Sequence, residues 1–310
     1  MLKWAISRFV ALWILILASL WLSLWLASSR ATSGTIILTH NIFLDHYKRF
    51  VLIDIDTRVS FAFSPELDDN ERIFAMILSP VQERLIMFGY LDDNSYGVRV
   101  TDLSGKDTIA PIALANTNVL ADSVTLTHDG RRAIIPTGIT NNRTEQFLLD
   151  VVSGDLERFT VEQTSQDPNI AWSPDDNTVA SIRDDSNDIS QIWLHDLATD
   201  SVIQLTDNDN STYCPAWSPD GEIIAYLETF AGIDHLRYIA VGSNNGTNLI
   251  GGEWHMMTCP QWTSNGHHLM FIASDAITSE TYLVLFDPFT GVETILFSVE
   301  SNAGIAIWHH

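Results

Sequence analysis

Short runs of alternating apolar and polar residues, separated by turn residues, follow one another along most of the chain. The clearest unit is Ala216–Tyr226, in which an apolar stretch leads into Trp217, Ser-Pro-Asp-Gly follows, and an alternating stretch returns. Proline suits the second position of a β-turn, aspartate caps the turn, and glycine tolerates a positive φ. Alternation with a period of two is typical of a strand. The unit therefore predicts two strands joined by a tight turn.

This unit recurs at a fixed interval. Ala171–Ser181 and Gln261–Phe271 have the same form, and the leading residues Trp172, Trp217 and Trp262 are each 45 residues apart. A repeat of about 40–45 residues made of short strands and turns is typical of a β-propeller blade. We expect the three tryptophans to be mostly buried between adjacent blades.

Weaker copies extend the repeat upstream. Leu126 opens a unit 46 residues before Trp172, and Leu78 opens another 48 residues before Leu126. Phe63–Pro65 is a competing start, but it lies 63 residues before Leu126, which is too long for one blade. A third-strand pattern, an apolar residue followed by aspartate and a turn, recurs at Val100–Leu103, Leu149–Val151, Leu194–Leu197 and Leu285–Asp287. The chain thus contains five complete repeats.

Two fragments flank these repeats and complement each other. Gly304–Trp308 reads as an opening strand with nothing after it, and the front of the chain reads as three strands without an opening strand: Thr35–Thr39, Phe50–Asp54 and Val59–Phe63. Their pairing would close the ring and leave no sheet edge exposed at the seam. The chain is therefore predicted to be all-β, with residues 31–310 forming a six-bladed β-propeller whose first blade is completed by the C-terminal strand.

The turn and returning strand at residues 217–226, Trp-Ser-Pro-Asp-Gly followed by Ile-Ala-Tyr, resemble the repeat of TolB-like propellers, also called WD40-like PD40 repeats. The units at Trp172, Trp217 and Trp262 match well, and the two upstream units match less well. The resemblance implies the fold. Propellers of this architecture serve protein docking, sensing and, in longer chains similar to prolyl oligopeptidases, the gating of an α/β-hydrolase domain. This chain ends in its propeller repeats, so no such domain is expected.

The N-terminus predicts a membrane anchor. Phe9–Ala27 is a run of 19 residues without a charge, which as a helix would cover most of a bilayer's hydrocarbon core. Lys3 and Arg8 precede it, so residues 1–30 are expected to form a cytoplasmic tip and a transmembrane helix, with the propeller exported. A cleavable signal peptide is the alternative because Ala27–Ser29 offers small residues, but the apolar run exceeds the usual length of about 7–15 residues.

The net charge of the chain restricts the kinds of molecule that it could bind. The chain has 39 acidic and 16 basic residues, for a net charge of −23. Nucleic-acid binding rests on clustered lysine and arginine, so a nucleic-acid partner is excluded. An acidic surface favours solubility and attracts cations or basic partners.

The sequence offers no catalytic, cofactor or metal motif. It lacks a Gly-x-Ser-x-Gly elbow, a His-Glu-x-x-His pair, a Walker loop and a nucleotide-binding glycine pattern. His267 and His268 are consecutive on a predicted strand, so they point to opposite faces and cannot share an ion. Asp207–Ser211 resembles the start of a calcium loop but lacks the central glycine and the bidentate glutamate, so a solvated connection is expected.

Cys214 and Cys259 are 45 residues apart and occupy equivalent places in adjacent repeats. In an exported chain this spacing permits a disulfide, but equivalent inner-strand positions lie near the limiting Cα separation of about 7 Å. A bridge and two separate buried cysteines both remain open.

The best candidate for a binding surface is the set of loops between second and third strands, which share one face of a propeller with the connections between blades. These loops are expected at Leu91–Gly97, Gly138–Glu145, Arg183–Ser190, Thr229–His235 and Ser274–Glu280. Their carboxylates would rim that face: Asp92, Asp93, Asp184, Asp185, Asp188, Asp234, Asp275 and Glu280. Such a rim could bind a cation or a basic peptide, and a solvated loop face without a ligand is the alternative.

The sequence alone therefore favours a non-enzymatic, membrane-anchored extracytoplasmic propeller that binds a protein or peptide through its loops. The alternatives are a carbohydrate-active lyase or hydrolase working in the central funnel and a structural component of the cell envelope. An enzyme would need histidines and carboxylates converging from the inner strands. The equivalent residues before the opening strands supply no acid–base pair; they are Ser123, Asn169, Cys214 and Cys259.

Overall fold

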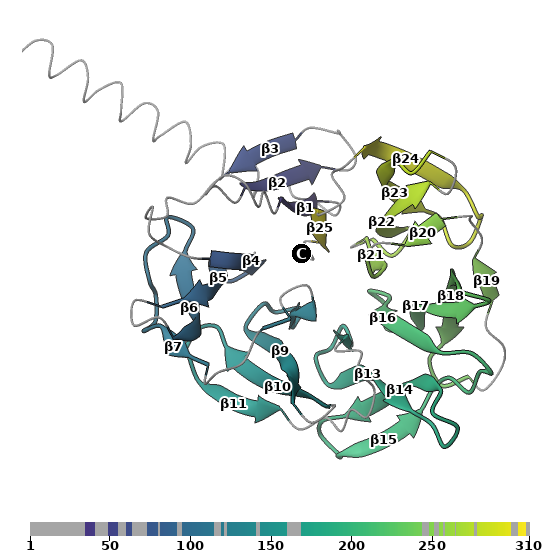
Figure 1. Cartoon of the computed structure of the whole chain (residues 1–310), viewed down its shortest axis with the longest axis horizontal. Coiled ribbons are helices and arrows are strands. Elements are labelled where there is room, and N and C mark those ends of the chain that lie inside the picture. Colours follow the sequence, from purple (N-terminus) through teal and green to yellow (C-terminus); the bar gives the residue numbers. More distant parts are fainter. Residues whose placement is uncertain are drawn as a thin grey trace, which may run out of the picture.

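The structure is a computed structural model. It describes residues 35–40, 49–54, 60–63, 73–79, 81–91, 95–114, 119–120, 123–140, 143–159, 169–243, 248–250, 254–256, 258–263, 265–275, 278–298 and 303–307. The described strands form six antiparallel sheets, which surround a common axis as the blades of a β-propeller (Figure 1). The all-β propeller predicted from the repeat is therefore confirmed.

Three sheets come from the first half of the chain and from its end. The first sheet consists, from the inside outward, of β25 (Ala303–Ile307), β1 (Thr35–His40), β2 (Arg49–Asp54) and β3 (Ser60–Phe63). The second consists of β4 (Ile73–Ser79), β5 (Arg84–Tyr90), β6 (Tyr96–Asp102) and β7 (Ile112–Ala113). The third consists of β8 (Thr125–Leu126), β9 (Arg132–Thr140), β10 (Arg143–Asp150) and β11 (Leu156–Phe159).

The remaining three sheets follow in chain order. The fourth consists of β12 (Ile170–Trp172), β13 (Thr178–Asp184), β14 (Ser190–Asp196) and β15 (Ser201–Gln204). The fifth consists of β16 (Thr212–Trp217), β17 (Ile223–Phe230), β18 (Ile233–Ala240) and β19 (Asn248–Ile250). The sixth has a divided inner strand, β20 (Trp254–Met256) and β21 (Gln261–Trp262), followed by β22 (Leu269–Asp275), β23 (Thr281–Phe286) and β24 (Glu293–Ser298).

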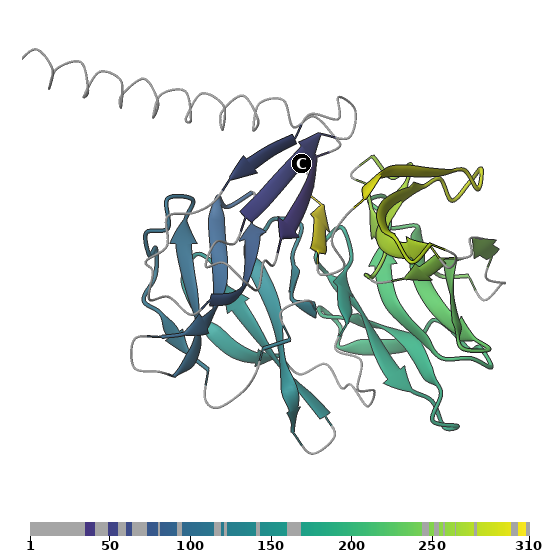
Figure 2. The ribbon, with the colours of Figure 1, turned by 45° about the horizontal axis from the view of Figure 1, so that its top comes forward.

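The last strand closes the ring on the first sheet, as predicted. β25 pairs antiparallel with β1, with Ile36 opposite Ile307 and His40 opposite Ala303. Figure 2 shows β25 (yellow) beside β1 (dark purple). Trp308, which was expected within this strand, lies outside the described residues. The pairing joins strands near opposite ends of the chain, so the ring has no open seam.

Because successive strands are antiparallel, the two ends of the sheets carry different connections. The loop face carries the hairpins between second and third strands and the connections from one sheet to the next. The turn face carries the turns between first and second strands, such as residues 173–177, and those between third and fourth strands, such as residues 197–200. The Ser-Pro-Asp-Gly repeat thus lies entirely on the turn face.

Hydrogen bonds explain why the repeat has this sequence. Ser218 Oγ donates to Asp220 Oδ1 (2.6 Å) and accepts from the amide of Ile223 (2.9 Å), so one hydroxyl closes the turn and starts the next strand. Thr127, Ser173 and Thr263 make the equivalent pairs of bonds in their own sheets. Gly221 has φ of 75° and lies against Pro174 of the preceding sheet, so the turns of neighbouring sheets also pack on each other.

Apolar clusters fill the spaces between neighbouring sheets. Trp172 and Trp262 are 3% and 2% exposed, and Trp262 Nε1 donates to the carbonyl of Ala216 in the preceding sheet (3.1 Å). These two tryptophans are buried, as predicted. Trp217 is less fully buried than these two, but it packs against the cluster between the fourth and fifth sheets, as predicted. Arg132 lies over the ring of Trp172, whereas the equivalent position beside Trp217 is Thr178, whose shorter side chain covers less of an indole.

No helix in the part of the chain that the structure describes is long and apolar enough to cross a membrane. Residues 1–34 lie outside that part, so the anchor expected in residues 1–30 stays a prediction.

Candidate functional site

The hairpin loops on the loop face are shorter and more regular than the sequence predicted. β17 ends at Phe230 and β18 begins at Ile233, so most of the expected loop Thr229–His235 is strand. The expected loop Gly138–Glu145 likewise consists mainly of β9 and β10. Residues 231 and 232 form a two-residue hairpin turn, which lets cross-strand pairing continue to the tip.

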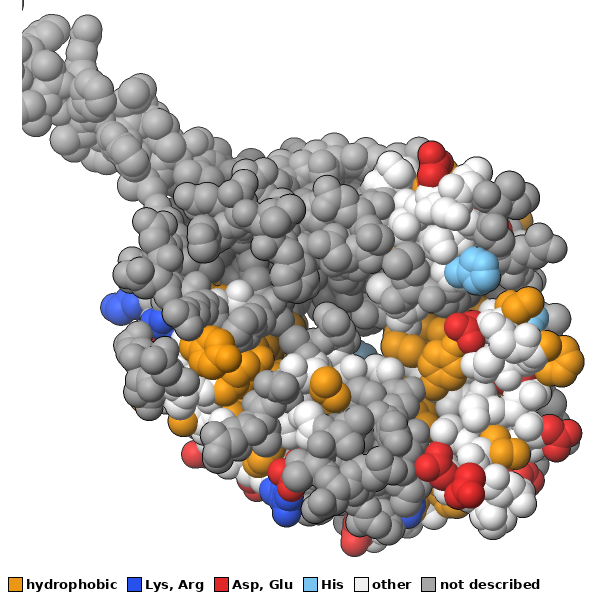
Figure 3. Space-filling view, in the orientation of Figure 1, with side chains coloured by type: hydrophobic (Ala, Val, Ile, Leu, Met, Phe, Trp, Pro, Cys, Tyr) orange, Lys and Arg blue, Asp and Glu red, His pale blue; other side chains and the backbone are white. Residues whose placement is uncertain are grey.

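The six described carboxylates of the predicted rim occur in three separate sheets; Asp92 and Asp93 lie outside the described residues. Asp184, Asp185 and Asp188 lie in the β13–β14 hairpin, Asp234 in β18, and Asp275 and Glu280 in the β22–β23 hairpin. Within the described residues, no three histidine, cysteine or acidic side chains are placed to hold a metal ion. In Figure 3 the acidic side chains of the described residues are spread along the right and lower parts of the ring, which is hollowed near its centre. The rim is therefore a distribution of charge rather than one cluster.

The β13–β14 hairpin carries the densest charge. Asp185 Oδ1 accepts hydrogen bonds from the amides of Asn187 (2.7 Å) and Ile189 (3.0 Å). The amide of Ile189, with that of Asn187, lowers the pKa of Asp185 below its usual value. Asp184 accepts from the hydroxyl of Ser190 (2.8 Å), and Asp188 is exposed with φ of 59°. Asp185 caps the hairpin and stays charged at neutral pH.

The other two hairpins use their carboxylates in the same local way. Asp234 Oδ1 accepts from Thr229 Oγ1 (2.9 Å), and Asp275 Oδ1 accepts from the amide of Thr278 (2.7 Å). Glu280 is exposed and accepts a hydrogen bond from Tyr282, which raises the pKa of that phenol. The bonds described here fix each carboxylate within its own hairpin.

A buried polar group lies beneath this face, between the fourth and fifth sheets, and sequence reasoning missed it. Thr206 Oγ1 donates to Gln191 Oε1 (2.7 Å), and both side chains are almost fully buried. Nearby, Glu228 is 4% exposed and forms an ion pair with Arg237. The signal was present in the alternating strand Ile223–Phe230, where a glutamate occupies an inward position.

The connection that resembled a calcium loop takes part in this group. Asn208 Nδ2 donates to the hydroxyl of Tyr226 (3.4 Å), and Asn210 Nδ2 donates to Glu228 Oε1 (3.3 Å). Asn208 also accepts on its carbonyl from Gln191 Nε2 (2.7 Å). The connection is thus held against the two sheets by its asparagines, rather than being simply solvated as the sequence suggested.

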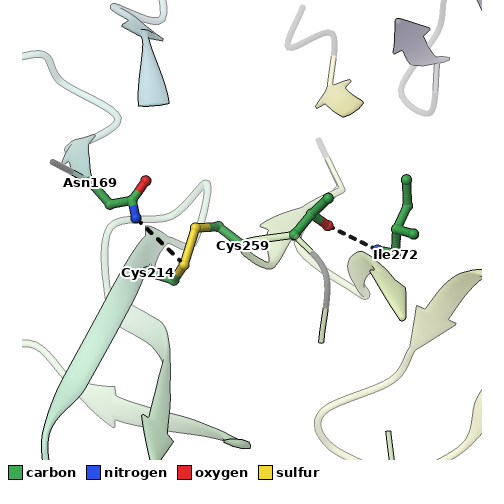
Figure 4. The surroundings of a disulfide bond; sticks show 5 residues. Asn169, Cys214, Cys259 and Ile272 are labelled. Atoms are coloured by element: carbon green, nitrogen blue, oxygen red, sulfur yellow. Dashed lines mark hydrogen bonds between the residues drawn. A yellow bond between two sulfur atoms is a disulfide. The ribbon is translucent and has the colours of Figure 1, made fainter. Parts of the chain in front are cut away.

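The inner rim of the ring holds a disulfide, which settles the question that the sequence left open. Cys214 of β16 is bonded to Cys259, which lies between β20 and β21, with their Cα atoms 5.1 Å apart (Figure 4). The bond joins the inner strands of two neighbouring sheets. Asn169 Nδ2 lies 3.8 Å from Cys214 Sγ and donates to it. Three of the four equivalent inner positions therefore contribute an amide and a disulfide, not an acid–base pair.

Comparison with known proteins supports the fold. No protein-family profile matches the chain. TolB from Acinetobacter baumannii superposes with a TM-score of 0.65 and 14% identity, over 88% of this chain and 67% of that one. The fold is that of a TolB-like β-propeller.

Enzymes are also among the similar proteins. A stretch of 102 residues is 30% identical to the uncharacterized peptidase YuxL of Bacillus subtilis and covers 31% of this chain but only 15% of that peptidase. A puromycin hydrolase superposes with a TM-score of 0.60 and 16% identity over 87% of this chain and 45% of the hydrolase. An oligogalacturonate lyase from Vibrio parahaemolyticus gives 0.58 and 10% over 87% of this chain and 75% of the lyase.

These relatives overturn one expectation drawn from the sequence. The absence of a recognisable motif favoured a non-enzymatic protein, but the similar proteins include a peptidase, a puromycin hydrolase and a lyase. The absence of a catalytic motif is weak evidence here, because the repeat pattern specifies only strands and turns and is shared by proteins of different function.

Proposed function

We propose that this propeller takes part in peptide hydrolysis and receives the peptide substrate at its loop face. The observation that carries the proposal is the 102-residue match to a peptidase, at 30% identity. The fold likeness to a puromycin hydrolase, which spans 87% of this chain, supports the same class of reaction. The chain spans 45% of the length of that hydrolase, and the match covers 15% of the peptidase. We therefore assign to this chain only the role of the propeller.

Charge on the loop face favours peptides with a free or basic amino group. Asp185 is held in its charged form by backbone amides, and Asp188 and Glu280 are exposed. With a net charge of −23, the surface attracts cationic substrates over several ångströms and speeds their encounter. The carboxylate rim, including Asp92 and Asp93, serves in this proposal as a steering surface.

We place the ring on the extracytoplasmic side, held by a transmembrane helix in residues 1–30. The uncharged run Phe9–Ala27 supports the anchor, and the disulfide between Cys214 and Cys259 supports an oxidising compartment. The complete assignment is a membrane-anchored, six-bladed propeller that acts on exported or external peptides.

Binding and cleavage are tested together on the full chain in detergent. Fluorescent peptides of equal length that are basic, neutral or acidic are titrated, and the mixtures are analysed by mass spectrometry. We expect the basic peptide to bind at least about tenfold more tightly than the acidic one at low salt, with the difference shrinking as salt rises. Failure of every peptide to bind or be cleaved would overturn the proposal.

Matched charge removals locate the surface. Asp188→Asn with Glu280→Gln removes two exposed charges from the loop face, and Glu83→Gln with Glu222→Gln removes two exposed charges from the turn face. Only the loop-face double variant is expected to bind the basic peptide more weakly. The melting temperatures of both double variants should equal that of the parent chain, because exposed charges contribute little to stability. Equal losses from the two pairs would show that net charge alone acts.

A second candidate is action on an acidic oligosaccharide in the central funnel, because the oligogalacturonate lyase is matched over 75% of its length. The same full-length preparation is incubated with oligogalacturonate, and unsaturated products are followed by absorbance. Product formation would favour this reaction over peptide hydrolysis.

A further inference from the structure

The chain enters the ring on the turn face. β24 begins after the turn at residues 287–292 and ends on the loop face, so β25 runs back toward the turn face. β1 is antiparallel to β25, with Ile36 opposite Ile307, and Thr35 therefore starts on the turn face. Seven residues separate Ala27, the end of the apolar run, from Thr35. Fully extended, they span about 25 Å, so an anchored chain holds this face close to the bilayer.

The sheets on both sides of the first sheet present apolar side chains on that face. Phe289 and Val292 are 62% and 58% exposed in the β23–β24 turn, and Val81 is 48% exposed in the β4–β5 turn. Both turns are held rigidly. Asp287 Oδ1 accepts from the amides of Phe289 (2.8 Å) and Thr290 (3.0 Å). Gln82 Nε2 donates to the carbonyl of Asp129 in the next sheet (2.9 Å).

Equivalent positions on the far side of the ring are small or acidic. In the fourth sheet, opposite the first (Figure 1), Ala198 stands where the sixth sheet has Phe289, and Asp175 stands where the second has Val81. The turns of the fourth sheet contain no lysine or arginine and carry Asp175, Asp176 and Asp200, and Asp196 ends the strand before the second turn. In the second sheet, Glu83 and Asp102 are balanced by Arg84 and Lys106, and Asp107 is paired with Arg99. The turn face thus exposes Phe289, Val292 and Val81 in the sheets beside the chain entry and carries aspartates in the fourth sheet opposite it.

We propose that the turn face docks on the lipid surface along the sheets that flank the first, with Phe289 and Val81 in contact with lipid. The proposal rests on the anchor of the proposed function. Apolar side chains on short, rigid turns gain free energy by entering the interfacial region, whereas carboxylates are repelled by anionic headgroups. The ring would therefore tilt, with its acidic side raised from the bilayer and its loop face open to incoming substrate.

Site-directed labelling tests this orientation. The chain's two cysteines are joined to each other, so Phe289→Cys provides a single free thiol for an environment-sensitive dye. Ala198→Cys, at the equivalent exposed position across the ring, is the matched control. Both full-length variants are reconstituted in phosphatidylcholine vesicles containing nitroxide-labelled lipid. We expect quenching of about twofold or more at position 289 and about a tenth or less at position 198.

Three other outcomes would overturn the proposal. If the protein floats with the vesicles but the dyes at positions 289 and 198 are quenched equally, or not at all, the anchor holds and the turn face does not dock. Protection of position 289 from aqueous iodide without quenching by lipid would show that a second copy covers it. Failure of the protein to float with vesicles would remove both the anchor and the docking, while the peptide-binding assay would still test the hydrolytic role separately.

Discussion

Single hydroxyl and carboxylate groups hold the turns of this ring in place. In four of the sheets the third strand ends in, or is followed directly by, an aspartate that accepts backbone amides of the following turn; the four are Asp102, Asp150, Asp196 and Asp287. Asp176 reaches further, because it accepts from the amide of His128 in the preceding sheet (2.9 Å). Burial raises its pKa, but hydrogen bonds from His128 outweigh burial and hold the value below the usual range.

These turn aspartates predict acid sensitivity. Hydrogen bonding from Ser104 lowers the pKa of Asp102, the amide of Thr199 lowers that of Asp196, and Thr290 lowers that of Asp287. Since the folded-state pKa values lie below the ordinary 3.8, this stability is present above pH 3.8 and is lost as the pH falls through the folded values. The melting temperature should be flat from about pH 5 to 7 and fall below about pH 4.

Asp287→Asn keeps an oxygen acceptor for Phe289 and Thr290 but does not titrate. Its melting temperature should fall less steeply with acid than that of the parent chain. A curve parallel to the parent's would show that this carboxyl does not contribute to the acid response.

A second prediction at this scale separates the tryptophans by their burial. Trp262→Ala should cost about 3–5 kcal/mol of unfolding free energy, because the side chain is 2% exposed and its indole donates to Ala216. Trp217→Ala should cost less, because this ring is only partly buried. Urea unfolding of both variants checks the order, and an equal or larger cost at Trp217 would contradict it.

At the scale of strands, three inner elements of the ring are unusual. β25 supplies the inner strand of the first sheet from the far end of the chain. The inner strand of the sixth sheet is divided, and both β20 and β21 pair with β22. β16 has a bulge, since its register passes directly from Tyr213 to Ala216. Both cysteines lie at these irregularities: Cys214 is in the bulge of β16, and Cys259 is in the segment between β20 and β21 that leaves the regular ladder.

Removal of the closing strand should open the ring. Deletion of Ala303–His310 exposes the edge of β1 and should lower the melting temperature sharply and promote aggregation. Deletion of His309 and His310 alone leaves β25 complete and serves as the control. Scanning calorimetry and light scattering on both chains measure the difference. Equal melting temperatures would show that the seam does not hold the ring.

The disulfide should add to this stability. It closes a loop of 45 residues, for which chain entropy predicts about 4 kcal/mol. Replacing both cysteines, Cys214→Ser with Cys259→Ser, should lower the unfolding free energy by about this amount and so shift the urea midpoint down. Reductant should bring the midpoint of the parent chain to the same value. A double variant that still responded to reductant would point to another cause.

At the scale of the molecule, the fold could be predicted from the sequence but the site could not. The 45-residue spacing and the Ser-Pro-Asp-Gly turn predict the strands and turns, because these depend on local hydrogen bonds such as those of Ser218. Ring closure could be predicted because the fragments at the two ends of the repeats complement each other. The polar group around Gln191 and Glu228 depends on packing between sheets, which no single repeat encodes. The bridging of Cys214 and Cys259 depends on local irregularities in two strands. Function was misjudged for a related reason, since repeats of this kind are shared by enzymes and non-enzymes.

The position of the closing strand also sets the order in which this protein is made. β1 is among the first strands to be synthesised and its inner partner β25 is the last. At about 5–20 residues per second, the inner edge of the first sheet waits roughly 15–60 seconds for its partner. During that interval the edge of β1 stays unpaired while the other sheets are completed. A chaperone that shields strand edges would therefore act on this chain at its first sheet, and for nearly the whole time of synthesis.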